Sequence, residues 1–295
     1  MKKIFFIIPA LVLTIICAAQ NEIKKNDILY GRITKEDLMT APFNKWFDSS
    51  YAVYKPDEEI INAIKKLNTK DISLQVFMGT WCGDSRREVP RLLKIVNELG
   101  WPATKVTIIA VGSSDSLYKQ SPNGEEAGKG LYRVPPIIIY KNGAEINRIN
   151  EFAVMSLERD LLNILTTNDY HPNYRSFTTI RNWVSTGMLL DKNNSSRGFA
   201  MQLKYIVNGE NELNGVGYIL LKQNKKEEAL KIFLVNTNLY PESANVLSSL
   251  GEGYLRNGDN KNAVVYLERA LEYNKEPLML KSILKLLYEA KGVKE

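Results

Sequence analysis

The feature that most constrains the fold is a 34-residue pattern that occurs twice in succession between residues 212 and 276. Small residues recur at fixed places, where two helices can approach closely, and large apolar residues recur where they would fill the space between helices. This period predicts stacked helical pairs that bury their apolar faces against one another. The aligned positions are Leu213 and Leu247, Val216 and Leu250, Gly217 and Gly251, Leu220 and Tyr254, Ala229 and Ala263, Phe233 and Leu267, Asn236 and Ala270, and Pro241 and Lys275.

The pattern resembles the tetratricopeptide repeat, in which Leu-Gly-x-x-Tyr is followed by Ala-x-x-x-Phe and then by Pro. Three positions depart from it: Leu220 replaces the Tyr, Asn236 replaces a small residue and Lys275 replaces the Pro. A terminal capping helix is expected over residues 277–291. The resemblance implies an all-α repeat domain, residues 212–295, that binds another protein.

Residues 56–165 alternate helical and strand patterns, which predicts an α/β fold with a mixed sheet. Strands are expected at 72–78, 105–111, 137–140 and 145–150, and helices beginning near Pro56, Ser85 and Ser156. The polar, Gly-rich residues 113–130 are expected to form a long loop. Residues 166–211 are predicted to be a helical connector, with helices near 174–186 and 198–207 that stack on the first repeat.

The sequence Trp-Cys-Gly-Asp-Ser, residues 81–85, lies between a buried strand and the start of a helix. Cys82 is therefore expected at a helix N-terminus, where exposed amides and the helix dipole favour a thiolate. Arg86 and Arg87 add positive charge nearby, and Asp84 opposes them. This placement makes Cys82 the candidate nucleophile.

At this point the chain resembles the thioredoxin superfamily, over residues 56–165. Trp-Cys-Gly stands at 81–83, Pro90 lies eight residues after Cys82, Val134-Pro135 precedes a strand, and Lys141-Asn142-Gly143 forms a hairpin turn. The resemblance implies a thioredoxin-like domain, residues 20–165, in which a mixed sheet is flanked by helices.

The same resemblance implies roles for individual residues. Cys82 would attack a disulfide, and Pro135 would follow a cis peptide bond beside it. The backbone of Val134 would pair with the substrate chain. The substrate would also lie against the other residues of the Cys82 turn, which are Trp81, Gly83 and Asp84.

Two departures from the family point to a single-thiol site. Ser85 stands where the second cysteine would be, and Val76 stands where the family has a buried acid. A hydroxyl cannot expel a captured partner as a thiol does, so Cys82 would need an outside thiol for release. The alternative is that Cys82 is inert and the domain is a scaffold, since the fold hosts many non-redox proteins.

Composition excludes several other classes of function. The chain has two cysteines and one histidine, His171, so a disulfide framework or a metal site of several Cys or His residues is not expected. No cofactor is expected. Without residues 1–19, 37 basic and 33 acidic residues remain, a net charge of +4 spread along the chain. Such a weak positive charge does not indicate a nucleic-acid partner.

Residues 1–19 have the layout of a signal peptide, with two lysines, an apolar stretch and small residues before Gln20. Cleavage after Ala19 would leave Cys82 as the sole cysteine of an exported, periplasmic protein. A second interpretation stays open, in which Cys17 is lipidated and anchors the protein to a membrane. Ile16 is bulky for that signal.

The sequence thus predicts an exported thiol–disulfide exchange protein that forms a mixed disulfide at Cys82. Its partners would be extracytoplasmic protein clients or a redox protein, with an outside thiol for turnover. The resemblance leaves open whether this amounts to an enzyme of the oxidoreductase or isomerase type. The alternative function is a protein-binding or assembly scaffold without catalysis.

Overall fold

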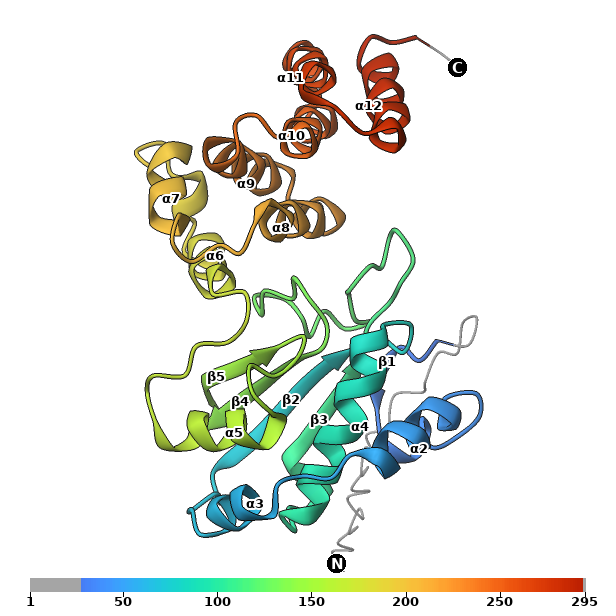
Figure 1. Cartoon of the computed structure of the whole chain (residues 1–295), viewed down its shortest axis with the longest axis vertical. Helices are drawn as coiled ribbons and strands as arrows, with labels where there is room; N and C mark the ends of the chain where they lie inside the picture. The colour runs from blue at the N-terminus through green and yellow to red at the C-terminus, as the bar shows by residue number, and fades with distance from the viewer. Residues whose placement is uncertain (1–27, 294–295) are drawn as a thin grey trace, which may run out of the picture.

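The computed structural model describes residues 28–293 and consists of a sheet part followed by a helical part (Figure 1). The expected leader, residues 1–19 with Cys17, lies outside the described residues. The sheet has five strands in the order β1-β3-β2-β4-β5. These strands are β1 (Gly31–Ile33), β2 (Ile72–Met78), β3 (Val106–Ala110), β4 (Pro136–Lys141) and β5 (Ala144–Asn150).

The central strands are buried on both faces. β2 and β3 run parallel, and the other neighbouring strands are antiparallel. On β2, Leu74 and Val76 belong to one apolar core, whereas Phe77 belongs to a core on the opposite face. Burial on both faces explains the continuous apolar runs at residues 76–78 of β2 and 137–139 of β4.

The two faces of the sheet are covered differently. The loop after β3, residues 111–135, covers one face, where Leu131 and Val134 pack against Phe77 and Ile138. Helices supply the apolar residues that cover the other face. The helices of the sheet part are α1 (Lys35–Leu38), α2 (Asn44–Val53), α3 (Glu58–Lys65), α4 (Gly83–Glu98), η1 (Ala103–Lys105) and α5 (Leu157–Thr166).

The predicted mixed sheet with flanking helices is therefore confirmed. α4 begins at Gly83, two residues before the expected start, because Cys82 is its N-cap, and it continues through Pro90. β1, α1 and α2 were not expected. β1 has only three residues and α2 buries only Phe47, so neither produces a clear periodic pattern.

The C-terminal part is entirely helical, as predicted. α6 and α7 share one buried cluster with α8 and α9, whereas α10, α11 and α12 form another. The elements are α6 (Ser176–Ser185), η2 (Met188–Leu190), α7 (Ser196–Leu203), α8 (Glu210–Lys222), α9 (Lys226–Leu239), α10 (Ala244–Arg256), α11 (Asn260–Tyr273) and α12 (Pro277–Ala290).

Two glycines mark the closest approach of neighbouring helices. A Cβ at Gly251 on α10 would lie 2.6 Å from Cγ of Leu267 on α11. A Cβ at Gly217 on α8 would overlap the ring of Phe233 on α9. The same contact thus occurs in both helical pairs at positions 34 residues apart, so the sequence period corresponds to a period in packing.

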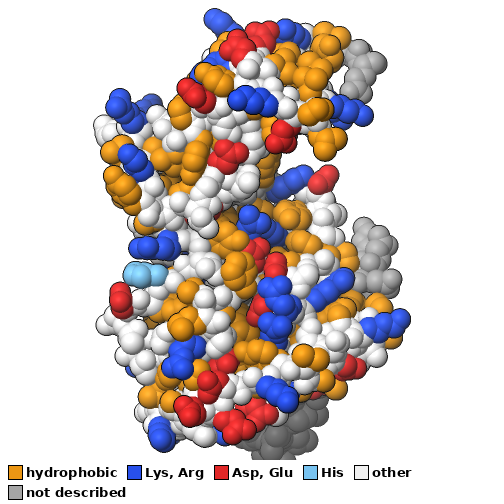
Figure 2. Space-filling view, viewed as in Figure 1, with side chains coloured by type: hydrophobic (Ala, Val, Ile, Leu, Met, Phe, Trp, Pro, Cys, Tyr) orange, Lys and Arg blue, Asp and Glu red, His pale blue; other side chains and the backbone are white. Residues whose placement is uncertain are grey.

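The loop after β3 connects the two parts. Tyr132 is buried among residues of α6, α7, α8 and α9. Arg181 on α6 donates to Glu145 on β5 over 2.7 Å, and Lys222 on α8 donates to Asp115 of the loop over 2.8 Å. In the view of Figure 2, the surface is hollowed between the sheet part and the helical part.

Candidate functional site

The site is a tight turn between the end of β2 and the start of α4. The amide of Cys82 donates to the carbonyl oxygen of Gly79 over 2.9 Å. The amide of Gly79 donates to Ser85 Oγ over 3.2 Å. A Cβ at Gly79 would lie 2.5 Å from the Trp81 ring, so this position requires glycine. These contacts hold Cys82 at the first exposed turn of α4.

Cys82 contacts the segment that leads into β4. Its thiol donates to the carbonyl oxygen of Val134 over 3.3 Å, and the Val134–Pro135 peptide bond is cis, as the resemblance implied. A carbonyl oxygen only accepts, so this hydrogen bond uses the thiol proton. The side chain of Cys82 is half-buried against the core that contains Phe77 and Val134.

Trp81 connects the turn to the long loop after β3. Its Nε1 donates to the carbonyl oxygen of Val111 over 3.1 Å. Its ring lies 5.4 Å from the ring of Tyr118, at an interplanar angle of 32°. The indole therefore forms one wall beside Cys82 and holds the loop against the turn.

The charges expected beside Cys82 are largely paired with one another. Arg87 pairs with Asp84 over 2.8 Å and with Glu88 over 2.5 Å. Arg86 Nε donates to the carbonyl oxygen of Thr80 over 2.5 Å. Asp84 and Glu88 thus balance the charge of Arg87, whereas Arg86 binds a neutral carbonyl oxygen and keeps its positive charge.

Ser85 has a structural role in this turn. Its side chain is fully buried, and its Oγ accepts from the amide of Gly79. Gly83, by contrast, is exposed, and a Cβ added there would meet nothing within 4 Å. The structure therefore brings Cys82, Trp81, Val134 and Pro135 together, with Ser85 beneath them.

Sequence reasoning missed two residues at this site. The ring of Tyr118 lies tilted against that of Trp81, and its neighbour Lys119 is buried within the loop. Both lie in a polar, Gly-rich segment with no helical or strand periodicity, so no sequence pattern indicated that they fold back onto Cys82.

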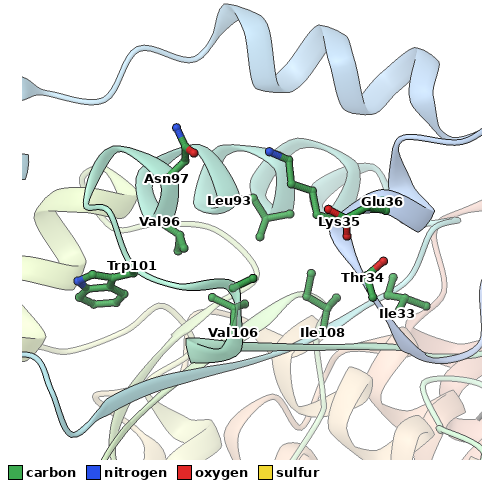
Figure 3. A pocket seen from close by; sticks show the side chains of 11 residues that line it. Ile33, Thr34, Lys35, Glu36, Leu93, Val96, Asn97, Trp101, Val106 and Ile108 are labelled. Atoms are coloured by element: carbon green, nitrogen blue, oxygen red, sulfur yellow. The ribbon is translucent and has the colours of Figure 1, made fainter. Parts of the chain in front are cut away.

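A pocket of about 370 Å³ lies away from Cys82, between the C-terminal half of α4 and β3 (Figure 3). Leu93 and Val96 on α4 face Val106 and Ile108 across it, and Trp101 lies at one end. None of its lining residues belongs to the Cys82 turn, so the pocket is not part of the candidate site.

Two further searches cover residues 28–293. No three His, Cys, Asp or Glu side chains in this range are grouped so that they could hold a metal ion. No helix in the same range is long and apolar enough to cross a membrane.

Comparison with known proteins assigns no family. No family model matches the sequence, and no curated protein is significantly similar to it.

Proposed function

We propose that the protein performs thiol–disulfide exchange through Cys82, in a thioredoxin-like domain with a single reactive thiol. The observation that supports this most directly is the placement of Cys82. It is the N-cap of α4, and its Sγ lies 3.3 Å from the carbonyl oxygen of the cis Val134–Pro135 peptide bond. A helix N-terminus stabilises a thiolate, and a half-buried position leaves the sulfur accessible to a partner.

The reaction needs only sulfur chemistry. The Cys82 thiolate attacks one sulfur of a client disulfide, so that a Cys82–client disulfide forms and the original S–S bond breaks. The second client sulfur leaves as a thiolate and takes a proton from water. An outside thiolate then attacks the client sulfur of the mixed disulfide, and Cys82 leaves as a thiolate.

The outside thiol is necessary because Ser85 cannot perform that second step. An alcohol does not ionise at neutral pH as a thiol does, and the Ser85 hydroxyl is already bound to the amide of Gly79. The mixed disulfide is therefore the long-lived species of the proposed cycle.

The helical part, as repeats of the tetratricopeptide type, would bind the protein client or a redox partner. Stacked helical pairs present a curved surface of the kind that binds protein segments. A binding surface on the same chain raises the local concentration of its partner near Cys82.

The proposal also includes export. Residues 1–19 would direct the chain out of the cytoplasm, and the clients would be extracytoplasmic. Such compartments contain the disulfide-bonded proteins that this chemistry acts on. A periplasmic protein is favoured over one anchored through lipidated Cys17.

The test is to trap partners in cells that express the full chain. Adducts that vanish with dithiothreitol and in Cys82→Ala, but persist in Ser85→Ala, support exchange at Cys82. Ser85→Ala is the matched control because it changes the same turn without removing the thiol. If the parent chain forms no adducts, the protein is a binding scaffold instead.

A further inference from the structure

Lys119 is a buried lysine that the chemistry above does not use. Its side chain is 6% exposed, and its Nζ donates to the carbonyl oxygen of Tyr132 over 2.7 Å. Lysines are rarely buried to this degree without a partner. Burial lowers the pKa of the Lys119 ammonium to about 8, so the charged form still predominates at neutral pH.

Two observations place Lys119 in the same region of the fold as Cys82. Tyr118, its neighbour in sequence, lies with its ring 5.4 Å from that of Trp81, the neighbour of Cys82. In addition, the Lys119 ammonium and the Cys82 thiol bind carbonyl oxygens only two residues apart, those of Tyr132 and Val134.

The charged groups around Lys119 come from several elements. Glu151 acts on the ammonium with negative charge, as Cys82 does once it is ionised, and Arg133 acts with positive charge. Glu151 pairs with Arg133 over 3.9 Å and accepts from the hydroxyl of Tyr174. Its negative charge is therefore divided among Arg133, Tyr174 and Lys119. The remaining facing group is Tyr118, whose ring centroid lies 5.1 Å from Lys119 Nζ.

We propose that Lys119 is a positioning residue that stabilises the Cys82 thiolate as its counter-ion. This inference rests on the proposed function. When Cys82 ionises, its proton passes to water and the hydrogen bond to Val134 is lost. The thiolate then has a buried ammonium nearby, whereas Arg87 is already neutralised by Asp84 and Glu88.

The experiment follows the rate of Cys82 alkylation by iodoacetamide against pH. The full chain carries Cys17→Ser, so Cys82 is its only thiol. In Lys119→Met, we expect the midpoint of the profile to move up by about one pH unit and the rate at pH 7 to fall about tenfold. Lys119→Arg keeps the positive charge and should retain most of the parent's alkylation rate at pH 7.

The matched control is Lys129→Met. Lys129 lies in the same loop, but its Nζ donates to the hydroxyl of Tyr140. Its removal should leave the profile unchanged. If Lys119→Met fails to fold, as judged by circular dichroism, Lys119→Gln replaces it in the comparison.

The outcomes separate the two proposals. If the parent forms client adducts and its profile coincides with that of a folded Lys119→Met or Lys119→Gln variant, Lys119 is not the counter-ion and the exchange function stands. If Lys119→Arg is as slow as Lys119→Met, shape rather than charge is responsible, and the inference is likewise wrong. If Cys82 of the parent does not react at any pH, the exchange function fails and the counter-ion role fails with it.

Discussion

The Cys82 thiol donates to the carbonyl oxygen of Val134 over 3.3 Å, across 52 residues of sequence. This hydrogen bond joins the N-cap of α4 to the segment that enters β4. A client chain that paired with the backbone of Val134 would therefore lie directly beside the sulfur. The same carbonyl holds the thiol proton, so ionisation of Cys82 frees this acceptor.

Ser85→Cys should turn the single-thiol site into one that releases its own partner. The new thiol would lie one helical turn after Cys82 and could attack the mixed disulfide. We expect reduction of insulin disulfides to rise about tenfold or more over the parent without glutathione. Ser85→Ala is the control and should show no gain. Equal rates for Ser85→Cys and the parent would mean that the buried position cannot reach the Cys82 sulfur.

Lys119 should make the stability of the protein depend on pH in the alkaline range. Its folded-state pKa of about 8 lies below the ordinary lysine value of 10.5, so the unfolded chain holds the proton more tightly between these values. The free energy of unfolding should therefore rise by about 3 kcal/mol from pH 8 to pH 10.5, and it should stay level below pH 8, where both states hold the proton.

Lys119→Met isolates this effect, because every other titrating group is shared by the two proteins. Urea unfolding of both at several pH values gives the difference directly. A constant difference between pH 7 and pH 10.5 would show that the ammonium is not desolvated in the fold.

The sequence was most informative where a side-chain period imposes a fold. The strand at 72–78 was predicted with the bounds that β2 has, because its apolar run is fixed by burial on both faces. The helices of residues 212–276 were predicted from the 34-residue period. Two glycines of that period, Gly217 and Gly251, lie where neighbouring helices touch. β1 was missed because three residues carry no period.

The environment of the candidate site was only partly predictable. The residues of the Cys82 turn are consecutive, so their proximity followed from the sequence. Tyr118 and Lys119 reach the turn through a loop without regular structure, and only tertiary packing decides where such a loop lies. The pairing of Arg87 with both Asp84 and Glu88 also depends on rotamers that the sequence does not specify.

Gly217→Ala should destabilise the helical part, because the added Cβ would overlap the Phe233 ring. Overpacking of this kind costs about 1–3 kcal/mol. Gly215→Ala is the matched control on the same helix, since a Cβ there would meet only Arg133 Nη2, 3.8 Å away. It should stabilise the helix by up to about 1 kcal/mol. The measurement is urea unfolding followed by circular dichroism. If both substitutions changed the free energy of unfolding in the same direction, the close contact between Gly217 and the Phe233 ring would be contradicted.

Arg181→Met should loosen the attachment of the helical part to the sheet. Arg181 Nη1 lies 2.7 Å from Glu145 Oε2, and both side chains are mostly buried. Met keeps the apolar stem that packs against Gly130 but removes the charge. We expect a loss of about 1.5–3 kcal/mol in the free energy of unfolding at neutral pH, as for hydrogen bonds to charged groups.

The loss caused by Arg181→Met should shrink as the pH falls, because burial raises the pKa of Glu145 and a protonated carboxyl no longer attracts the guanidinium. Lys222→Met removes a second ion pair between the described parts, the one with Asp115. That carboxylate is 97% exposed, so water screens the pair and stability should not change measurably. Unfolding curves at pH 4 and pH 7 for the three proteins test this contrast. Equal losses from the two substitutions at pH 7 would show that burial of the Glu145 pair does not strengthen the junction.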